Sequence, residues 1–470
     1  MNKFQYNYGL WQALGIAVQA KRIERGSERA LVELQNARFA KLLGYARGHS
    51  PFYERLYRKE DSGLTLSNLE SLPSVTKTTV MENFDEVLTD RSVDKATVLQ
   101  FAENPSNVGR SLKGQYFVAR TSGTTGLVAH YVHDLFSYFL IHVLTAVRSK
   151  GVTPFSFLTK GKIAPERLRI ANLDAPSADL GVASVIASAP QWVRAFVDFK
   201  LLDIFEKWED NISSLNRFQP HILGSFPTIL EQLAESQRAG TLRIHPRTVT
   251  SGGEILTSSV RKAISEAFGC EVCDCYGCSE AGWVGMECEE RHGIHIFSDW
   301  VIVEPVDETN RRVPPGVECD KILLTNLANY VQPFIRFELS DRATLLEGEC
   351  PCGSVLPRVL LKGRAEEVLY FSVGEGRKIA VPPVLFSTLA YMVPGLHRYQ
   401  VIQDDGYSLT VLFAVRSDAD GAAVQSSLKC NFEEYFAKNA LMPFIKLNIR
   451  QTDAIERDPG GKVRHVFSRV

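Results

Sequence analysis

The densest group of possible ligand-binding residues is a short run of hydroxyl and glycine residues. Residues 121–126 read TSGTTG and directly follow the apolar run 116–119. Glycine lets the backbone turn and approach a ligand closely, while hydroxyl and amide groups supply donors for phosphate oxygens. The run lacks the GKS/T ending of a Walker A loop, and a polar turn between a strand and a helix has the same composition. The residues alone therefore predict either a phosphate loop or an ordinary turn.

A lysine near the end of the chain is a second candidate. Lys462 follows Gly460 and Gly461 within the run DPGGKVR at 458–464. Such a turn is flexible enough to deliver a point charge to a site that closes around its substrate. Most lysines in turns of this kind are solvated surface charges, so the position alone leaves both interpretations open.

Cysteines and histidines form two pairs that are far apart in the sequence. Cys288 is followed by His292 and His295, and a single residue separates Cys350 from Cys352. Two such pairs can hold a structural Zn²⁺ ion that joins two loops through three sulfurs and one nitrogen. Isolated buried thiols are the alternative. The odd number of cysteines, nine, disfavours a disulfide framework and suits a reducing compartment.

Six segments, in sequence order, resemble the signatures of adenylate-forming enzymes, the superfamily that includes acyl-CoA synthetases. They are TSGTTG at 121–126, TSGGE at 250–254, YGCSE at 276–280, the segment 334–341, GRAEE at 363–367 and GGK at 460–462. With the N-terminal segments 45–53 and 72–77, the resemblance is closest to phenylacetate-CoA ligases and the capsule-biosynthesis-like proteins grouped with them. Each segment alone is a weak signal, but six in order across most of the chain are a strong one.

The resemblance implies an enzyme that joins a carboxylate to the α-phosphate of ATP, releases pyrophosphate and transfers the acyl group to an acceptor. The residues it assigns to ATP or AMP binding are Thr121, Ser122, Gly123, Thr124, Thr125, Gly126, Gly252, Gly253, Glu254, Tyr276, Gly277, Ser279, Glu280, Asp341 and Arg364. Within this set, Tyr276 is expected to flank the adenine ring and the backbone of 252–254 to line its opposite side. Asp341, assisted by Arg364, is expected to hold the ribose hydroxyls.

The same resemblance implies catalytic and magnesium-binding roles. The expected catalytic residues are Lys462, Glu280 and Thr125. Glu280 is also expected to bind Mg²⁺, a hard cation suited to carboxylate and phosphate oxygens. A helix-capping carboxylate is the alternative for Glu280, and an ion pair with Arg336 or Arg342 is the alternative for Asp341.

The resemblance also favours one histidine for the zinc site, because some phenylacetate-CoA-ligase-like proteins carry zinc at such a position. The zinc ligands that it implies are Cys288, His295, Cys350 and Cys352. An acyl pocket is expected at Phe226, in the turn 223–227, and at Trp283, just after Glu280. These aromatic side chains would suit an aryl or alkyl acid, but both could equally be ordinary core residues.

The family pattern is incomplete near the expected hinge. Glu366 and Glu367 replace the two aspartates usual in the family, and the segment that helps to shape the thioester-forming conformation is reduced to 374–376 followed by 381–383. The resemblance implies coenzyme A as the acceptor, and this departure leaves amide formation on an amine and loading of a carrier protein open as alternatives. A non-catalytic nucleotide-binding protein is a further hypothesis, which the joint presence of the TSGTTG run and Lys462 disfavours.

Apolar patterns predict the elements that must position these groups. The segment 24–58 has helix-like apolar spacing. Between residues 170 and 269, short apolar runs alternate with helical segments at 191–208, 228–238 and 258–268, which predicts βαβ units and a largely parallel sheet. The resemblance implies an α/β fold with a large N-terminal adenylate-forming domain, residues 1–363, whose first 90 residues are helical. A small mobile α+β lid domain, residues 364–470, is expected to follow.

Composition limits the partners. The chain has 53 Lys and Arg against 54 Asp and Glu, so no bulk charge attracts nucleic acid. The apolar stretch 10–20 is too short to span a bilayer and lacks a cleavage site, so neither a membrane span nor a signal peptide is expected. We therefore expect a cytoplasmic enzyme that acts on a small carboxylic acid, and the identity of the acid and the oligomeric state stay open.

Overall fold

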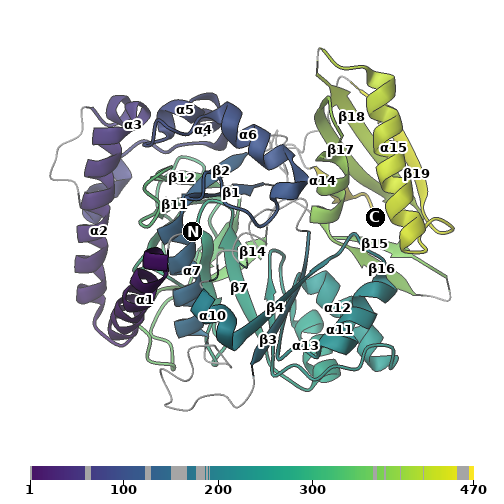
Figure 1. Cartoon of the computed structure of the whole chain (residues 1–470), viewed down its shortest axis with the longest axis horizontal. Coiled ribbons are helices and arrows are strands. Elements are labelled where there is room, and N and C mark those ends of the chain that lie inside the picture. Colours follow the sequence, from purple (N-terminus) through teal and green to yellow (C-terminus); the bar gives the residue numbers. More distant parts are fainter. Residues whose placement is uncertain are drawn as a thin grey trace.

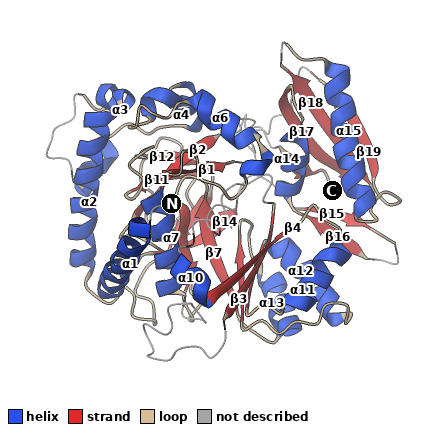
Figure 2. Cartoon of the chain, viewed as in Figure 1, coloured by secondary structure: helices blue, strands red, loops and turns tan. Residues whose placement is uncertain are grey.

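The computed structural model describes residues 3–58, 65–121, 129–149, 167–175, 186, 189, 191–363, 368–374, 377–391, 393–416, 418–452 and 465–470. Their helices and strands form a large α/β body and a smaller α/β unit built from the C-terminal residues (Figure 1). Helices surround the strands of the large body (Figure 2). Along the described part of the chain, no helix is both long and apolar enough to cross a membrane.

The N-terminal part is helical, as the apolar spacing predicts. Helix α1 spans Lys3–Glu24, α2 Glu28–His49 and α3 Pro51–Leu56. The predicted stretch 24–58 is interrupted because the Ser27 and Ser50 hydroxyls accept hydrogen bonds from the N–H groups of Ala30 and Tyr53, which starts a new helix at each serine. The following short helices are η1 Leu66–Ser71, α4 Lys77–Glu82, α5 Phe84–Val87, α6 Lys95–Glu103 and η2 Pro105–Asn107.

A two-stranded hairpin carries the TSGTTG run. Strand β1 (Tyr116–Arg120) pairs antiparallel with β2 (His130–Asp134), and Arg120 lies opposite His130. Helix α7 (Leu135–Arg148) follows directly, and its N-cap Asp134 accepts a hydrogen bond from the Ser137 N–H at 2.7 Å. Residues 122–128, which connect the two strands, lie outside the described residues.

The largest sheet has nine strands in the order β13-β14-β9-β8-β7-β6-β5-β3-β4. Its bounds are β3 Leu168–Asp174, β4 Val197–Asp203, β5 Ile222–Ser225, β6 Thr248–Gly252, β7 Val272–Cys278, β8 Gly282–Glu287, β9 Ile294–Ile296, β13 Arg342–Leu345 and β14 Arg358–Gly363. From β4 to β7 neighbouring strands are parallel, and from β7 to β13 they are antiparallel. The associated helices are α10 Gln191–Phe196, α11 Trp208–Phe218, α12 Pro227–Arg238 and α13 Ser258–Phe268. The prediction of a parallel sheet with βαβ units is confirmed for this region.

One predicted helix is wrong in its second half. The segment 191–208 forms only the short helix α10 before it becomes strand β4. Strand β4 pairs with β3 along its whole length, from Val197 opposite Leu168 to Asp203 opposite Asp174. The edge of the sheet offers unpaired backbone groups there, so tertiary pairing outweighs the helical spacing.

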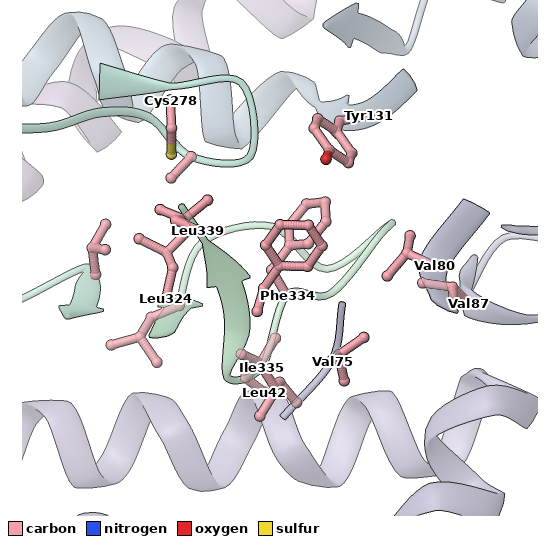
Figure 3. Close-up of a cluster of buried hydrophobic side chains, with 14 of the residues drawn as sticks. Leu42, Val75, Val80, Val87, Tyr131, Cys278, Leu324, Phe334, Ile335 and Leu339 are labelled. Carbon is pink, nitrogen blue, oxygen red and sulfur yellow. The ribbon is translucent and has the colours of Figure 1, made fainter. Parts of the chain in front are cut away.

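A three-stranded sheet and a shared hydrophobic cluster tie the N-terminal helices to these strands. The sheet contains β10 Val301–Val306, β11 Lys321–Asn326 and β12 Phe337–Leu339 in that order. Leu42 of α2, Tyr131 of β2, Cys278 of β7 and Phe334 all point into one cluster (Figure 3). The rings of Tyr131 and Phe334 meet edge to face with centroids 5.2 Å apart. The hairpin and the end of β7 therefore share one core.

The C-terminal residues form a core of their own. Its elements are β15 Leu369–Ser372, β16 Lys378–Val381, α14 Pro383–Tyr391, β17 Leu396–Asp405, β18 Ser408–Val415, α15 Gly421–Lys438, β19 Lys446–Gln451 and β20 Val466–Ser468. A separate hydrophobic cluster runs from Leu369 to Val466. This unit contacts the large body where the Gln232 side chain donates a hydrogen bond to the Ala380 carbonyl at 2.7 Å. The predicted hinge, residues 364–367, lies outside the described residues, so the exact domain boundary stays a prediction.

Candidate active site

Three predicted motif turns lie at one edge of the large sheet. Strands β5, β6 and β7 run parallel and are neighbours, so their carboxyl ends meet at that edge. The turn at Phe226 follows β5, the turn 252–254 lies at the end of β6, and Ser279 and Glu280 follow β7. Ligands of open α/β sheets bind outside the carboxyl ends of strands. The fold thus brings together segments that are 25 or more residues apart in sequence.

Aromatic rings pack on both sides of the glycine pair in the turn 252–254. A methyl group at Gly252 would lie 3.3 Å from the benzo ring of Trp283, and one at Gly253 would lie 2.8 Å from the Phe226 ring. Gly253 also has φ +80°, a conformation that other residues rarely adopt. Trp283 lies opposite Gly277 across the β7–β8 pair and covers it as well. The two predicted acyl-pocket residues therefore lie beside the predicted adenine turn.

The Glu254 side chain joins this turn to helix α12. Its carboxylate accepts hydrogen bonds from Thr228, from the backbone N–H at 3.2 Å and from the hydroxyl at 2.9 Å. Thr228 lies in the first turn of α12, where backbone N–H groups lack partners within the helix. Burial of the carboxyl group raises the pKa of Glu254 to about 7. The side chain thus fixes the turn, while the turn backbone remains the predicted adenine-lining element.

Tyr276 and Asp341 are in direct contact. The Tyr276 hydroxyl donates a hydrogen bond to Asp341 Oδ2 at 3.2 Å, and both residues are buried. The alternative partners proposed for Asp341 form other ion pairs: Arg336 with Glu304 at 3.4 Å, and Arg342 with Glu318 at 2.6 Å. Asp341 therefore lies next to the tyrosine predicted to flank adenine, and its ribose-binding role stays a prediction.

Glu280 lies in a tight connection between two antiparallel strands. Strand β7 ends at Cys278 and β8 begins at Gly282, so no helix follows Glu280, and the residue is 5% exposed. The helix-cap alternative is therefore wrong. The sequence-based predictions missed His133 and Asn326, whose side chains hold this connection.

Several predicted residues cannot be placed. Residues 122–126, Arg364 and Lys462 lie outside the described residues. Thr121 is described: its hydroxyl accepts a hydrogen bond from the Ala129 N–H at 3.0 Å, and its own N–H donates to the Ala129 carbonyl at 2.9 Å. In this structure the Thr121 side chain closes the base of the β1–β2 connection.

A second cluster brings together the four predicted zinc ligands. The ligand atoms of Cys288, His295, Cys350 and Cys352 all lie within 4.8 Å of one another. The sulfurs of Cys288 and Cys350 are 3.7 Å apart, and Cys352 Sγ is 3.6 Å from His295 Nε2. His295 Nδ1 lies 3.1 Å from the Leu356 carbonyl, which can only accept, so Nδ1 carries the proton and Nε2, which faces Cys352 Sγ, is the nitrogen that can bind a metal.

Comparisons with known proteins agree with this fold. Residues 199–320 match the family model described as AMP-binding enzyme. The chain is 22% identical to Protein CapK from Staphylococcus aureus, over 94% of this chain and 90% of the relative. It is 24% identical to phenylacetate-coenzyme A ligase from Thermus thermophilus, over 78% and 77%. A crystal structure of 2-hydroxyisobutyryl-CoA ligase superposes with a TM-score of 0.62 at 20% identity, covering 95% of this chain and 91% of that one.

Residues 199–320 thus match AMP-binding enzymes, and the chain has the fold of the adenylate-forming superfamily. Its relatives lie on the phenylacetate-CoA ligase-like branch of that superfamily. The resemblance inferred from the motifs is confirmed.

Proposed function

We propose that the protein activates an aryl or alkyl carboxylic acid as its acyl-adenylate and then transfers the acyl group to coenzyme A. The observation that carries the proposal is the meeting of Tyr276, Asp341 and the aromatic-walled turn 252–254 at one sheet edge. A carboxylate can accept hydrogen bonds from the two hydroxyls of a ribose, and a neighbouring tyrosine ring can pack against the flat base. The phenylacetate-coenzyme A ligase and 2-hydroxyisobutyryl-CoA ligase matches favour coenzyme A as the acceptor.

Each residue has a defined task in this proposal. Asp341 holds the ribose, and the 121–126 run holds the β- and γ-phosphates through backbone N–H and hydroxyl donors. Glu280 would hold Mg²⁺, because it is a buried carboxylate in the connection that follows β7. When bound, Mg²⁺ neutralises charge on the phosphates. Lys462 approaches when the C-terminal unit closes and stabilises charge between the carboxylate and the α-phosphate.

The four-residue cluster fits a structural Zn²⁺ ion. Zn–S bonds of 2.3 Å and Zn–N bonds of 2.0–2.1 Å in a tetrahedron give S–S separations of about 3.8 Å and S–N separations of about 3.5 Å. The separations here are 3.7 Å and 3.6 Å. Three thiols and one imidazole with a fixed tautomer leave no position for a substrate, so the ion would have a structural role.

The cysteines of this cluster can bind zinc only as reduced thiols, which a reducing compartment preserves. All nine cysteines, each of which is among the described residues, are free thiols. Since thiols stay reduced in the cytoplasm, we propose a cytoplasmic location.

Pyrophosphate release over a panel of aryl and alkyl acids tests the function. Release that depends on one acid, and on coenzyme A for multiple turnovers, is the expected result. Turnover with hydroxylamine or another amine, but not with coenzyme A, would instead assign amide formation. Turnover only with an added carrier protein would assign the loading reaction.

A further inference from the structure

Two side chains from outside the motif segments form hydrogen bonds with the backbone carbonyls of Ser279 and Glu280. His133 Nε2, on β2, lies 2.8 Å from the Ser279 carbonyl, and Asn326 Nδ2, at the end of β11, donates to the Glu280 carbonyl at 3.0 Å. His133 and Asn326 are 1% and 3% exposed. Two consecutive carbonyls are thus fixed by donors from two different sheets, which leaves the Glu280 backbone little freedom.

The protonation state of His133 follows from these contacts. A carbonyl only accepts, so His133 Nε2 carries the proton, and Nδ1 is the acceptor that faces Asn329 Nδ2 at 3.5 Å. Burial lowers the pKa of His133 to about 4, so the ring is neutral in the physiological range. The residue is therefore a fixed donor, and the mechanism proposed above gives it no role in proton transfer.

The same short segment that carries Asn326 also holds the strand that returns from the TSGTTG run. Asn329 Nδ2 donates to the Val132 carbonyl at 2.8 Å, and Gln332 Oε1 accepts from the Val132 N–H at 2.7 Å. Asn329 and Gln332 have no exposed surface. We call His133, Asn326, Asn329 and Gln332 the amide bracket.

The bracket connects the two elements that the proposed function requires to act together. Val132 and His133 lie on β2, a few residues after the phosphate run, and Asn326 holds the carbonyl of Glu280. The hydrophobic cluster supports the same junction, because Tyr131 of β2 and Cys278 before the turn point into it together (Figure 3). A buried polar network with this many long-range bonds fixes a distance more precisely than apolar packing does.

We propose that the amide bracket positions Glu280 relative to strand β2, and so sets the enzyme's requirement for a divalent cation in the adenylation step. This inference rests on the proposed function. Mg²⁺ demands a nearly ideal octahedron with bonds of 2.0–2.1 Å, so the carboxylate and the phosphates that it joins must be held at a narrow separation. A shift of about 1 Å in a positioned group can cost on the order of 10²-fold in rate. His133 and Asn326 are positioning residues, because they act through the backbone of the Glu280 turn.

The test compares His133→Leu, which removes the donor, with His133→Gln, which keeps an N–H donor. Pyrophosphate release is measured at graded Mg²⁺ concentrations, and conversion of supplied acyl-adenylate, which contains no pyrophosphate, is measured separately. His133→Leu should raise the Mg²⁺ concentration for half-maximal rate and lower adenylation about 10- to 100-fold. The rate of the second half-reaction should stay close to that of wild type, and His133→Gln should recover most of the lost adenylation rate.

A matched control separates positioning from stability. His221 is another buried histidine, whose Nδ1 accepts a hydrogen bond from the Arg169 N–H at 3.1 Å at the opposite end of the sheet strands. His221→Leu should leave the Mg²⁺ dependence unchanged. Equal losses in both half-reactions of His133→Leu, or an unchanged Mg²⁺ dependence, would overturn the inference. If His133→Leu does not fold, Asn326→Ser is measured in the same way, and failure of both variants to fold would make the bracket a folding element only.

A binding measurement keeps this inference distinct from the proposed function. His133→Leu should weaken MgATP binding but leave AMP binding unchanged, whatever the acid substrate is. A wild-type protein that binds MgATP but releases no pyrophosphate with any acid would contradict the proposed function alone. Equal MgATP affinity in wild type and His133→Leu would contradict the bracket's role alone.

Discussion

The Tyr276 hydroxyl and the Asp341 carboxylate are joined by a hydrogen bond of 3.2 Å, which links the end of β7 to the residue before β13. The bond orients the carboxylate that we propose for the ribose, and Tyr276 itself packs into the core that it shares with the N-terminal helices. Both residues are buried, so the pair has little freedom to reorient. The first prediction concerns this pair.

Tyr276→Phe keeps the ring and removes the hydroxyl. Loss of this hydrogen bond to a charged group should lower the free energy of unfolding by about 1.5–3 kcal/mol. AMP affinity should fall as well, because Asp341 is no longer held in one orientation. Asp341→Ala should weaken AMP binding at least as much. Calorimetric titration with AMP measures both variants. Unchanged AMP affinity in Asp341→Ala would remove this residue from the nucleotide site.

The zinc proposal predicts about one equivalent of zinc per chain in the purified protein. Cys350→Ser should lose the metal and lower the melting temperature, because metal-binding energy contributes to folding. Cys430→Ser is the matched control, since Cys430 is an exposed thiol on α15 and should change neither quantity. Elemental analysis and thermal unfolding decide the matter. A zinc-free wild-type protein of full stability would identify the four residues as buried, unliganded side chains.

The raised pKa of Glu254 predicts that the free energy of unfolding depends on pH. Burial raises the pKa of its carboxyl group from 4.5 to about 7, so the folded protein retains a proton that the unfolded chain loses near pH 4.5. The free energy of unfolding should therefore fall as pH rises from about 4.5 to 7, and this contribution should level off above 7. Glu254→Gln cannot ionise and should become progressively more stable than wild type over that interval. Glu235→Gln, an exposed change on α12, the helix that Glu254 contacts through Thr228, should show no such trend in melting temperature.

Trp283 predicts a change in acid preference. Its ring covers Gly252 and Gly277, so Trp283→Ala should open space at the sheet edge. The ratio of kcat/KM for a bulkier acid to that for a smaller one should rise on the order of 10- to 100-fold, the range for a changed hydrophobic pocket. Trp208→Ala, on α11, is the control for lost packing. An unchanged ratio, with a stability loss in both variants, would make Trp283 an ordinary core residue.

The motif residues were predictable from sequence because each turn requires particular residue types. Only glycine fits against the Phe226 ring at position 253, with its positive φ and that ring 2.8 Å from any added methyl group. The convergence of Cys288 and His295 with the pair at 350 and 352 also followed from residue type, although it rested on the family resemblance to select His295.

The amide bracket could not be predicted, because its bonds join distant segments. His133 and Ser279 are 146 residues apart, and Asn329 contacts Val132 across 197 residues. In the sequence these asparagine and histidine residues cannot be distinguished from other polar residues, because only the fold brings their hydrogen-bond partners close. Strand β4 was missed for a related reason, since its pairing with β3 comes from the tertiary structure.

The central claim is that this chain forms an acyl-adenylate, and acid-dependent exchange of labelled pyrophosphate into ATP tests it most directly. We expect Mg²⁺-dependent exchange with at least one aryl or alkyl acid. Lys462→Ala should lower that exchange on the order of 10²- to 10³-fold, the size of one lost electrostatic contact, while AMP binding changes far less. Absence of exchange with every acid, in wild-type protein that is folded and binds MgATP, would contradict the account.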